Sequence, residues 1–122
     1  METWTLTWTK LAALDDKSVK DIPDGIPGVY RLSYKDGDGN YYVFYVGKAD
    51  DIKVRLQEHL SRSEQNVRIK NYIEVKKCFF RYAKATKDYI RSSAERQMYR
   101  QFEPPCNDKE PEGRDDVKVN LT

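Results

Sequence analysis

Two apolar, aromatic-rich runs with a turn sequence between them constrain this chain more than any other stretch. The runs are residues 29–34 and 41–46, and the turn at 36–40 reads Asp-Gly-Asp-Gly-Asn. β-Branched and aromatic residues favour strands, and a Gly/Asp/Asn cluster between two such runs is typical of a hairpin turn. The stretch therefore predicts an antiparallel β-hairpin. Side chains alternate between faces along a strand, so Tyr41, Val43 and Tyr45 are expected on the same face.

After the hairpin, the spacing of apolar residues changes from two to four, which is typical of amphipathic helices. One such stripe consists of Ile52, Leu56 and Leu60, and a later one of Ile90, Ala94, Met98 and Phe102. Residues 78–83 lie between the stripes and favour a third strand. The expected fold class is α+β, with a small central antiparallel sheet of about three strands, the hairpin first, flanked by helices.

The chain length is that of one domain with additions at each end. Residues 1–27 are expected to form an N-terminal arm, 28–107 the folded domain, and 108–122 a polar, flexible tail. The arm ends in a stretch rich in proline and glycine, and the tail is acidic and polar.

Composition bears on whether the protein is secreted, membrane-bound or cytoplasmic. No apolar run approaches the length that a membrane span needs, and the N-terminus lacks the pattern of a signal peptide. Cys78 and Cys106 are too few for a disulfide scaffold and form no metal-binding CxxC pair. We therefore expect reduced thiols, a cytoplasmic protein and no membrane partner.

The net charge of +2 is unevenly distributed along the chain. Residues 53–100 carry thirteen Lys/Arg against five Asp/Glu, whereas residues 1–52 carry six against nine. An excess of +8 in the middle segment is compatible with a solvated helical surface. It is equally compatible with a face that follows the phosphates of a nucleic acid.

Several residues in and after the hairpin occur in an informative order. Gly-Val-Tyr at 28–30 is followed by Tyr-Val-Gly at 45–47. The later members of the series are Lys48, Arg55, His59, Glu95 and, after a proline pair, Asn107. Taken together in this order, these residues resemble the signature of the GIY-YIG nucleases. The resemblance covers residues 28–107, which it implies are a GIY-YIG-like catalytic domain.

The resemblance implies a divalent-metal-dependent endonuclease that hydrolyses DNA phosphodiester bonds. It assigns catalytic roles to seven residues, which are Tyr30, Tyr45, Lys48, Arg55, His59, Glu95 and Asn107. Glu95 would hold a single Mg²⁺ or Mn²⁺, although a helical glutamate is by itself more simply a surface residue paired with Arg91 or Tyr99. Arg55 offers a planar fork for phosphate oxygens. Either Tyr30 or His59 can be the general base, and both alternatives stay open at this point.

The resemblance leaves a second class of function open, namely a non-catalytic nucleic-acid-binding module that keeps the fold. A domain that only binds DNA has no need of Glu95, so the complete series favours the enzyme. The expected partner is duplex or branched DNA. One site handles one phosphate at a time, so a monomer is expected to nick one strand with little sequence specificity, and a homodimer would be needed to cut both.

Overall fold

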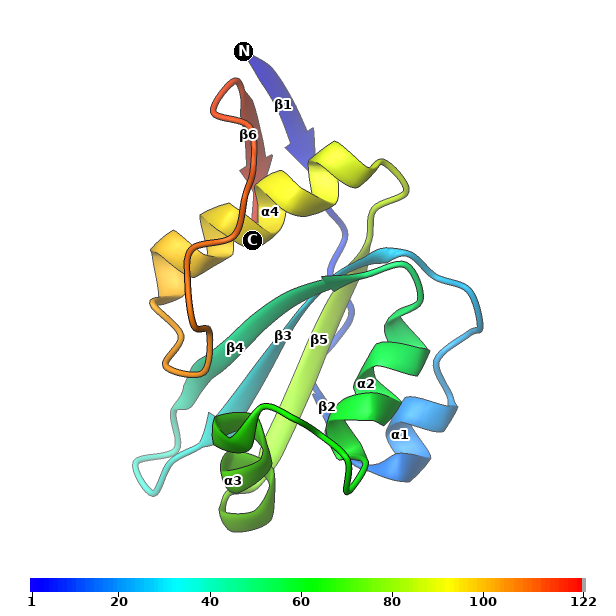
Figure 1. Ribbon diagram of the computed structural model, residues 1–122, viewed down its shortest axis with the longest axis vertical. Coiled ribbons are helices and arrows are strands. Elements are labelled where there is room, and N and C mark those ends of the chain that lie inside the picture. The colour runs from blue at the N-terminus through cyan, green and yellow to red at the C-terminus, as the bar shows by residue number, and fades with distance from the viewer. Residues whose placement is uncertain (122) are drawn as a thin grey trace.

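The computed structural model describes residues 1–121, and a four-stranded antiparallel sheet forms its centre (Figure 1). In sheet order the strands are β2 (Ala12–Ala13), β5 (Cys78–Lys84), β3 (Gly28–Lys35) and β4 (Tyr41–Ala49). The predicted α+β class is confirmed, and β3 and β4 form the expected hairpin. The sheet has one strand more than expected, because the N-terminal arm adds the two-residue β2 to the edge of β5.

A β-bulge changes the alternation of side chains along β4. Leu32 pairs with Tyr45 and Ser33 pairs with Val43, so Phe44 is an extra residue on this strand. Phe44 and Tyr45 therefore pack on the same face of the sheet, while Val43 packs on the other. The expectation that Val43 and Tyr45 share a face is wrong, because a bulge inserts one residue and reverses the alternation after it.

Helices cover both faces of the sheet (Figure 1). On one face pack α1 (Asp16–Lys20), α2 (Ile52–Leu60) and α3 (Val67–Val75), and on the other packs α4 (Asp88–Phe102). The apolar stripes at four-residue spacing are the buried faces of α2 and α4. Because β4 is an edge strand, groups from α2 and α4 can approach each other around its end.

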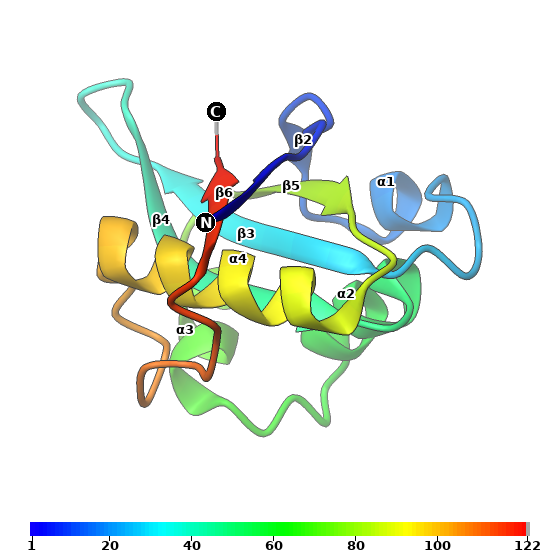
Figure 2. The same cartoon turned by 90° about the horizontal axis from the view of Figure 1, so that it is seen from above.

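The two ends of the chain pair with each other. The strands β1 (Glu2–Thr5) and β6 (Val117–Asn120) form a separate parallel pair beside α4 (Figure 2). Val117 and Val119 are buried, and the side-chain amide of Gln97 bonds to their backbone, donating to Val117 O and accepting from Val119 N. The sequence predicts a flexible tail, whereas residues 117–120 are held by this packing and pairing.

Within residues 1–121, no helix has both the length and the apolar character that crossing a membrane requires.

Candidate active site

The two glycine-containing motifs meet across the hairpin. Tyr30 of β3 is the direct cross-strand partner of Gly47 of β4. A Cβ atom placed on Gly47 would lie 2.5 Å from both Cζ and the hydroxyl oxygen of Tyr30. The Tyr30 ring therefore lies directly over Gly47, and only glycine leaves room for it.

Tyr30 forms a buried hydrogen bond with His59. The Tyr30 hydroxyl lies 2.7 Å from Nε2 of His59, and both side chains are inaccessible to solvent. Burial and the neighbouring Tyr45 raise the pKa of Tyr30 well above its usual range, and Arg55 only partly offsets this. Tyr30 therefore stays a neutral phenol unless another group takes its proton, and His59 is in position to do so.

Burial also determines the charge of His59. Its removal from water, followed by repulsion from Arg55, lowers the pKa of the imidazole to about 4. His59 is thus neutral at physiological pH, and a neutral imidazole has one nitrogen that donates and one that accepts. Nε2 can therefore accept the proton of Tyr30 only if the hydrogen of the neutral imidazole is on Nδ1.

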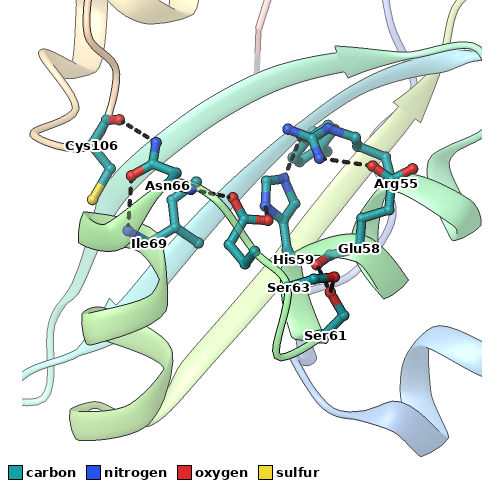
Figure 3. A network of polar contacts seen from close by, with 10 residues as sticks. Arg55, Glu58, His59, Ser61, Ser63, Asn66, Ile69 and Cys106 are labelled. Carbon is teal, nitrogen blue, oxygen red and sulfur yellow. Dashed lines mark hydrogen bonds and ion pairs between the residues drawn. The ribbon is translucent and has the colours of Figure 1, made fainter.

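Glu64 provides a partner for that Nδ1. Its Oε2 lies 3.1 Å from Nδ1 of His59, and its Oε1 accepts a hydrogen bond of 3.0 Å from the backbone N–H of Asn66. Figure 3 shows this network reaching from Arg55 and His59 to Asn66 and Cys106. Reasoning from the sequence missed Glu64, because it lies in a loop after α2, where no helical spacing relates it to His59.

Tyr45 and Arg55 lie beside this buried pair and are more open to solvent. The Tyr45 ring centre is 6.1 Å from that of Tyr30 and 5.3 Å from that of His59. Burial raises the pKa of Tyr45, while the charge of Arg55 opposes the shift. Arg55 is about one-third exposed and bonds to Glu58 through a single contact of 3.1 Å. The partly exposed Arg55 therefore places a positive charge near both tyrosines, the buried Tyr30 and the more open Tyr45.

Glu95 lies on α4, and Lys48 of β4 reaches the same helix. Burial raises the pKa of Glu95, and the charge and backbone amide of Lys48 partly offset the shift. Lys48 is itself held by α4, because its ammonium group donates a 2.8 Å hydrogen bond to the hydroxyl of Ser92. The negative charge of Glu95 also raises the pKa of Tyr30 and of Tyr45, so α4 places this carboxylate in the neighbourhood of the tyrosines.

The donor set is compatible with magnesium chemistry. Among residues 1–121 there is no cluster of three or more His, Cys, Asp or Glu that could enclose a metal ion. Mg²⁺, however, is commonly bound by one or two carboxylates together with waters and substrate phosphates. Glu95 is a half-buried carboxylate without an ion pair in the described part of the chain, and it fits this mode of binding.

Residues 26–109 match a known family, described as the GIY-YIG catalytic domain. The chain belongs to this family. GIY-YIG domains are nucleases that act on DNA and generally use divalent metal ions, so the protein is of the endonuclease type. The matched range spans the positions of the seven residues that the sequence suggested for the site, from Tyr30 to Asn107.

One of these residues of the GIY-YIG domain faces the backbone. Asn107 accepts a 3.0 Å hydrogen bond from Val46 N through Oδ1 and donates one of 2.9 Å to Val46 O through Nδ2. The preceding Cys106 N–H donates to the carbonyl of Phe44. The segment after α4 therefore pairs with the edge of β4 as a further strand would. In this arrangement Asn107 fixes the backbone next to Gly47 and directs neither polar atom of its side chain at a reacting group.

Ion pairs reduce the basic charge that is available on the GIY-YIG domain for DNA. Five of the thirteen basic residues in 53–100 contact carboxylates: Lys53, Arg55, Arg91, Arg96 and Arg100. Arg96 and Arg100 of α4 pair with Glu110 and Asp115 of the tail. The remaining eight form no ion pair within residues 1–121, and two of them are exposed, Lys84 at the end of β5 and Lys87 just before α4. The expected phosphate-binding surface is therefore smaller than the charge count suggests.

Proposed function

We propose that the protein is a divalent-metal-dependent endonuclease that hydrolyses phosphodiester bonds of duplex or branched DNA and nicks one strand. The observation that carries the proposal is the buried hydrogen bond between Tyr30 and His59, located beside Arg55 and near Glu95. A tyrosine with a raised pKa can pass its proton only to a group in direct contact, and Nε2 of His59 lies 2.7 Å from the Tyr30 hydroxyl.

The proton path runs inward from the substrate. A water beside Tyr45, the more exposed neighbour of Tyr30, attacks phosphorus, and the bond from phosphorus to the leaving oxygen breaks. The water gives its proton to the Tyr45 hydroxyl, Tyr45 passes a proton to Tyr30, and the Tyr30 hydroxyl gives its own proton to Nε2 of His59. The leaving oxygen departs with the bonding electron pair. In this proposal Tyr30 and His59 act in series, and neither is the general base alone.

Cationic groups stabilise the charge that develops on the phosphate. Arg55 is partly exposed beside both tyrosines, and its fork matches the geometry of phosphate oxygens. Lys48 is held by Ser92 close to Glu95 and provides a second positive charge. Preorganised donors of this kind act mainly in the transition state, where the charge is greatest.

A single Mg²⁺ or Mn²⁺ would be held through Glu95 together with waters and the substrate phosphate. When bound, the ion supplies Lewis-acid stabilisation of the phosphoryl oxygens. Asn107 acts as a positioning residue in this proposal, because it holds the strand that carries Gly47 and Lys48.

Nicking with little sequence preference follows from the number of sites and from what surrounds them. One Tyr30/Arg55/Glu95 site handles one strand at a time, and cutting both strands together requires a second copy related by symmetry. The strands β1 and β6 of the arm and tail pair with each other beside α4, and the arm's α1 is a five-residue helix packed on the opposite face of the sheet, so in residues 1–121 these segments present no additional recognition helix. Contacts to phosphates position a protein on DNA without specifying sequence.

A cleavage assay on supercoiled plasmid with Mg²⁺ or Mn²⁺, and with EDTA as the control, tests the proposal. Nicked circles should precede linear product, and mapped cuts should be scattered. Glu95→Gln should abolish cleavage while Glu112→Gln, an exposed tail glutamate, should not. Full activity of Glu95→Gln would contradict the metal assignment. DNA binding without cleavage under all these conditions would favour the alternative, a non-catalytic nucleic-acid-binding module.

A further inference from the structure

Glu64 is a buried carboxylate that the proposed reaction has not yet used. Its side chain is only 5% exposed, although it lies in the loop between α2 and α3. A charged side chain in such a position loses its hydration, so it persists only where other groups bond to it. Both of its oxygens are occupied, one by His59 Nδ1 and the other by the backbone of Asn66.

These two contacts have a consequence for the imidazole. An ionised carboxylate can only accept hydrogen bonds, so the His59 nitrogen that faces Glu64 must carry a hydrogen. Because His59 is neutral, its other nitrogen then has a free lone pair. That nitrogen is Nε2, and it faces the hydroxyl of Tyr30 at 2.7 Å.

We propose that Glu64 is a positioning residue that holds His59 in the Nδ1–H tautomer, so that Nε2 accepts the proton of Tyr30. The chain of contacts is a carboxylate, an imidazole and a hydroxyl, and in it the carboxylate orients the base and stabilises the imidazolium that forms. The inference rests on the proposed nuclease function for its catalytic consequence, but the tautomer is a property of the free protein.

The loop that carries Glu64 is itself anchored. Asn66 caps α3 by accepting a hydrogen bond from Ile69 N, and its side-chain amide donates a 3.0 Å hydrogen bond to the carbonyl of Cys106. Cys106 in turn bonds through its N–H to Phe44 of β4. The carboxylate is therefore tied to the same edge strand that contributes Tyr45, Gly47 and Lys48. Such support explains how a loop residue can keep an orientation precise enough for proton transfer.

Among the groups that face His59, Glu64 is the one whose charge stabilises the protonated imidazole. Tyr30 of β3 and Tyr45 of β4 face the imidazole as neutral phenols. Arg55, one helical turn earlier on α2, lowers the pKa of His59, whereas Glu64 is the group that raises it. Glu64 is thus the side chain that favours the imidazolium after proton transfer, against the opposing effects of burial and Arg55.

Glu64→Gln is the sharpest single change, because it keeps the size of the side chain. Glutamine has one oxygen and one NH₂ group. If its oxygen accepts from Asn66 N, its NH₂ faces Nδ1 and forces His59 into the Nε2–H tautomer. If its oxygen instead faces His59, its NH₂ opposes the N–H of Asn66. The matched control is Glu74→Gln, which removes the same charge from an exposed position on α3.

The first measurement is ¹⁵N NMR of the imidazole at pH 7, which reports the tautomer directly. His59 is the only histidine in the chain, so its imidazole signals need no assignment to a residue. The wild type and Glu74→Gln should show Nδ1 protonated and Nε2 free. The Nε2–H tautomer in the wild type would overturn the inference, whether or not Glu64→Gln folds.

The second measurement is the rate of plasmid cleavage, separated into turnover and KM. Glu64→Gln should reduce turnover by about 10²-fold, the scale of a lost acid–base contribution, with the KM for DNA unchanged. A variant with normal turnover and only a lower melting temperature would show a structural role and would also overturn the inference. If the wild type cleaves no DNA, the proposed nuclease function fails, and the NMR result still decides the tautomer.

Discussion

The Tyr30 hydroxyl and His59 Nε2 are separated by 2.7 Å at a place closed to solvent on all sides by β3, β4 and α2. A hydrogen bond in such a place behaves differently from one at the surface, because neither partner can exchange it for water. Folding therefore fixes the charge state of His59 as well as its position. This coupling between burial and protonation should be measurable as a dependence of stability on pH.

We expect the free energy of unfolding to fall between pH 6.5 and pH 4 through His59. Its pKa is about 4 in the folded protein, against 6.5 for an unperturbed histidine. In this window the unfolded chain binds a proton that the folded chain does not, so acid favours unfolding. The contribution is on the order of 3 kcal/mol over the window and becomes constant below pH 4. Urea denaturation of the wild type and of His59→Gln at pH 7 and pH 4.5 measures it.

His59→Gln is the control in that experiment. Carboxylates also titrate in this pH range, and their effect on the free energy of unfolding is present in both proteins. The wild type should lose more stability than His59→Gln on acidification. Equal losses in the two proteins would mean that His59 is protonated in the folded state at pH 4.5.

The glycine at the end of β4 provides a second test. In Gly47→Ala the new methyl group would meet the Tyr30 hydroxyl at 2.5 Å, so the ring must shift and its hydroxyl leaves its present position beside His59. We expect a loss of about 1–3 kcal/mol of stability from the forced displacement. We also expect cleavage to fall by at least about 10²-fold because the proton path is broken. Chemical denaturation and plasmid nicking measure the two effects.

Gly37→Ala is the matched control for this change. A Cβ on Gly37, in the hairpin turn, would have no atom within 4 Å. It should leave nicking unchanged. A Gly47→Ala variant that cleaves as fast as Gly37→Ala would show that the contact between Tyr30 and His59 is not needed for the reaction.

The parts of the fold that local patterns specify could be predicted from the sequence. The turn residues at 36–40 and the apolar stripes of α2 and α4 depend on neighbours in the chain, and these elements are where the patterns placed them. Long-range features could not be predicted in this way. The bulge opposite Leu32 depends on how two strands are matched, and the pairing of β1 with β6 joins residues more than a hundred positions apart.

The same distinction applies to the candidate site. The ordered series from Tyr30 to Asn107 was visible because a family resemblance connects residues that periodicity cannot connect. Glu64 belongs to no such series, and its contact with His59 depends on the path of an irregular loop anchored by Asn66. Loop residues that act on a catalytic group are therefore found from the hydrogen bonds around that group rather than from spacing.

Arg55→Ala should reduce turnover far more than it reduces affinity for DNA. Arg55 is held beside Tyr45 and Tyr30 with one bond to Glu58, so it can direct donors at the developing charge on the phosphate. Groups of this kind contribute mainly in the transition state, and losing one costs about 10²- to 10³-fold in rate. Single-turnover cleavage and equilibrium DNA binding measure the two quantities. Arg62→Ala, at an exposed position after α2, is the control. A parallel fall in rate and affinity would make Arg55 a docking contact only.

Salt dependence of DNA binding should distinguish the unpaired basic residues from those in ion pairs. Phosphate contacts release counterions, so affinity should fall as salt rises, with a slope of about −0.9 per contact in a double-logarithmic plot. Lys84 and Lys87 are exposed and lie next to Gly28 and the start of α4, whereas Arg96 and Arg100 are already paired with the tail. We expect the double variant Lys84→Gln/Lys87→Gln to weaken binding and flatten the slope by up to about 2.

The matched variant Arg96→Gln/Arg100→Gln removes the same charge from positions that carboxylates already neutralise. It should change the slope much less, because ion-paired side chains have few counterions to release. Fluorescence anisotropy with a labelled duplex, at several salt concentrations, compares the two double variants with the wild type. Equal effects would mean that only net charge matters and that the tail does not shield α4. A flat response of the wild type would mean that the basic segment is solvated surface and that DNA is held by other contacts.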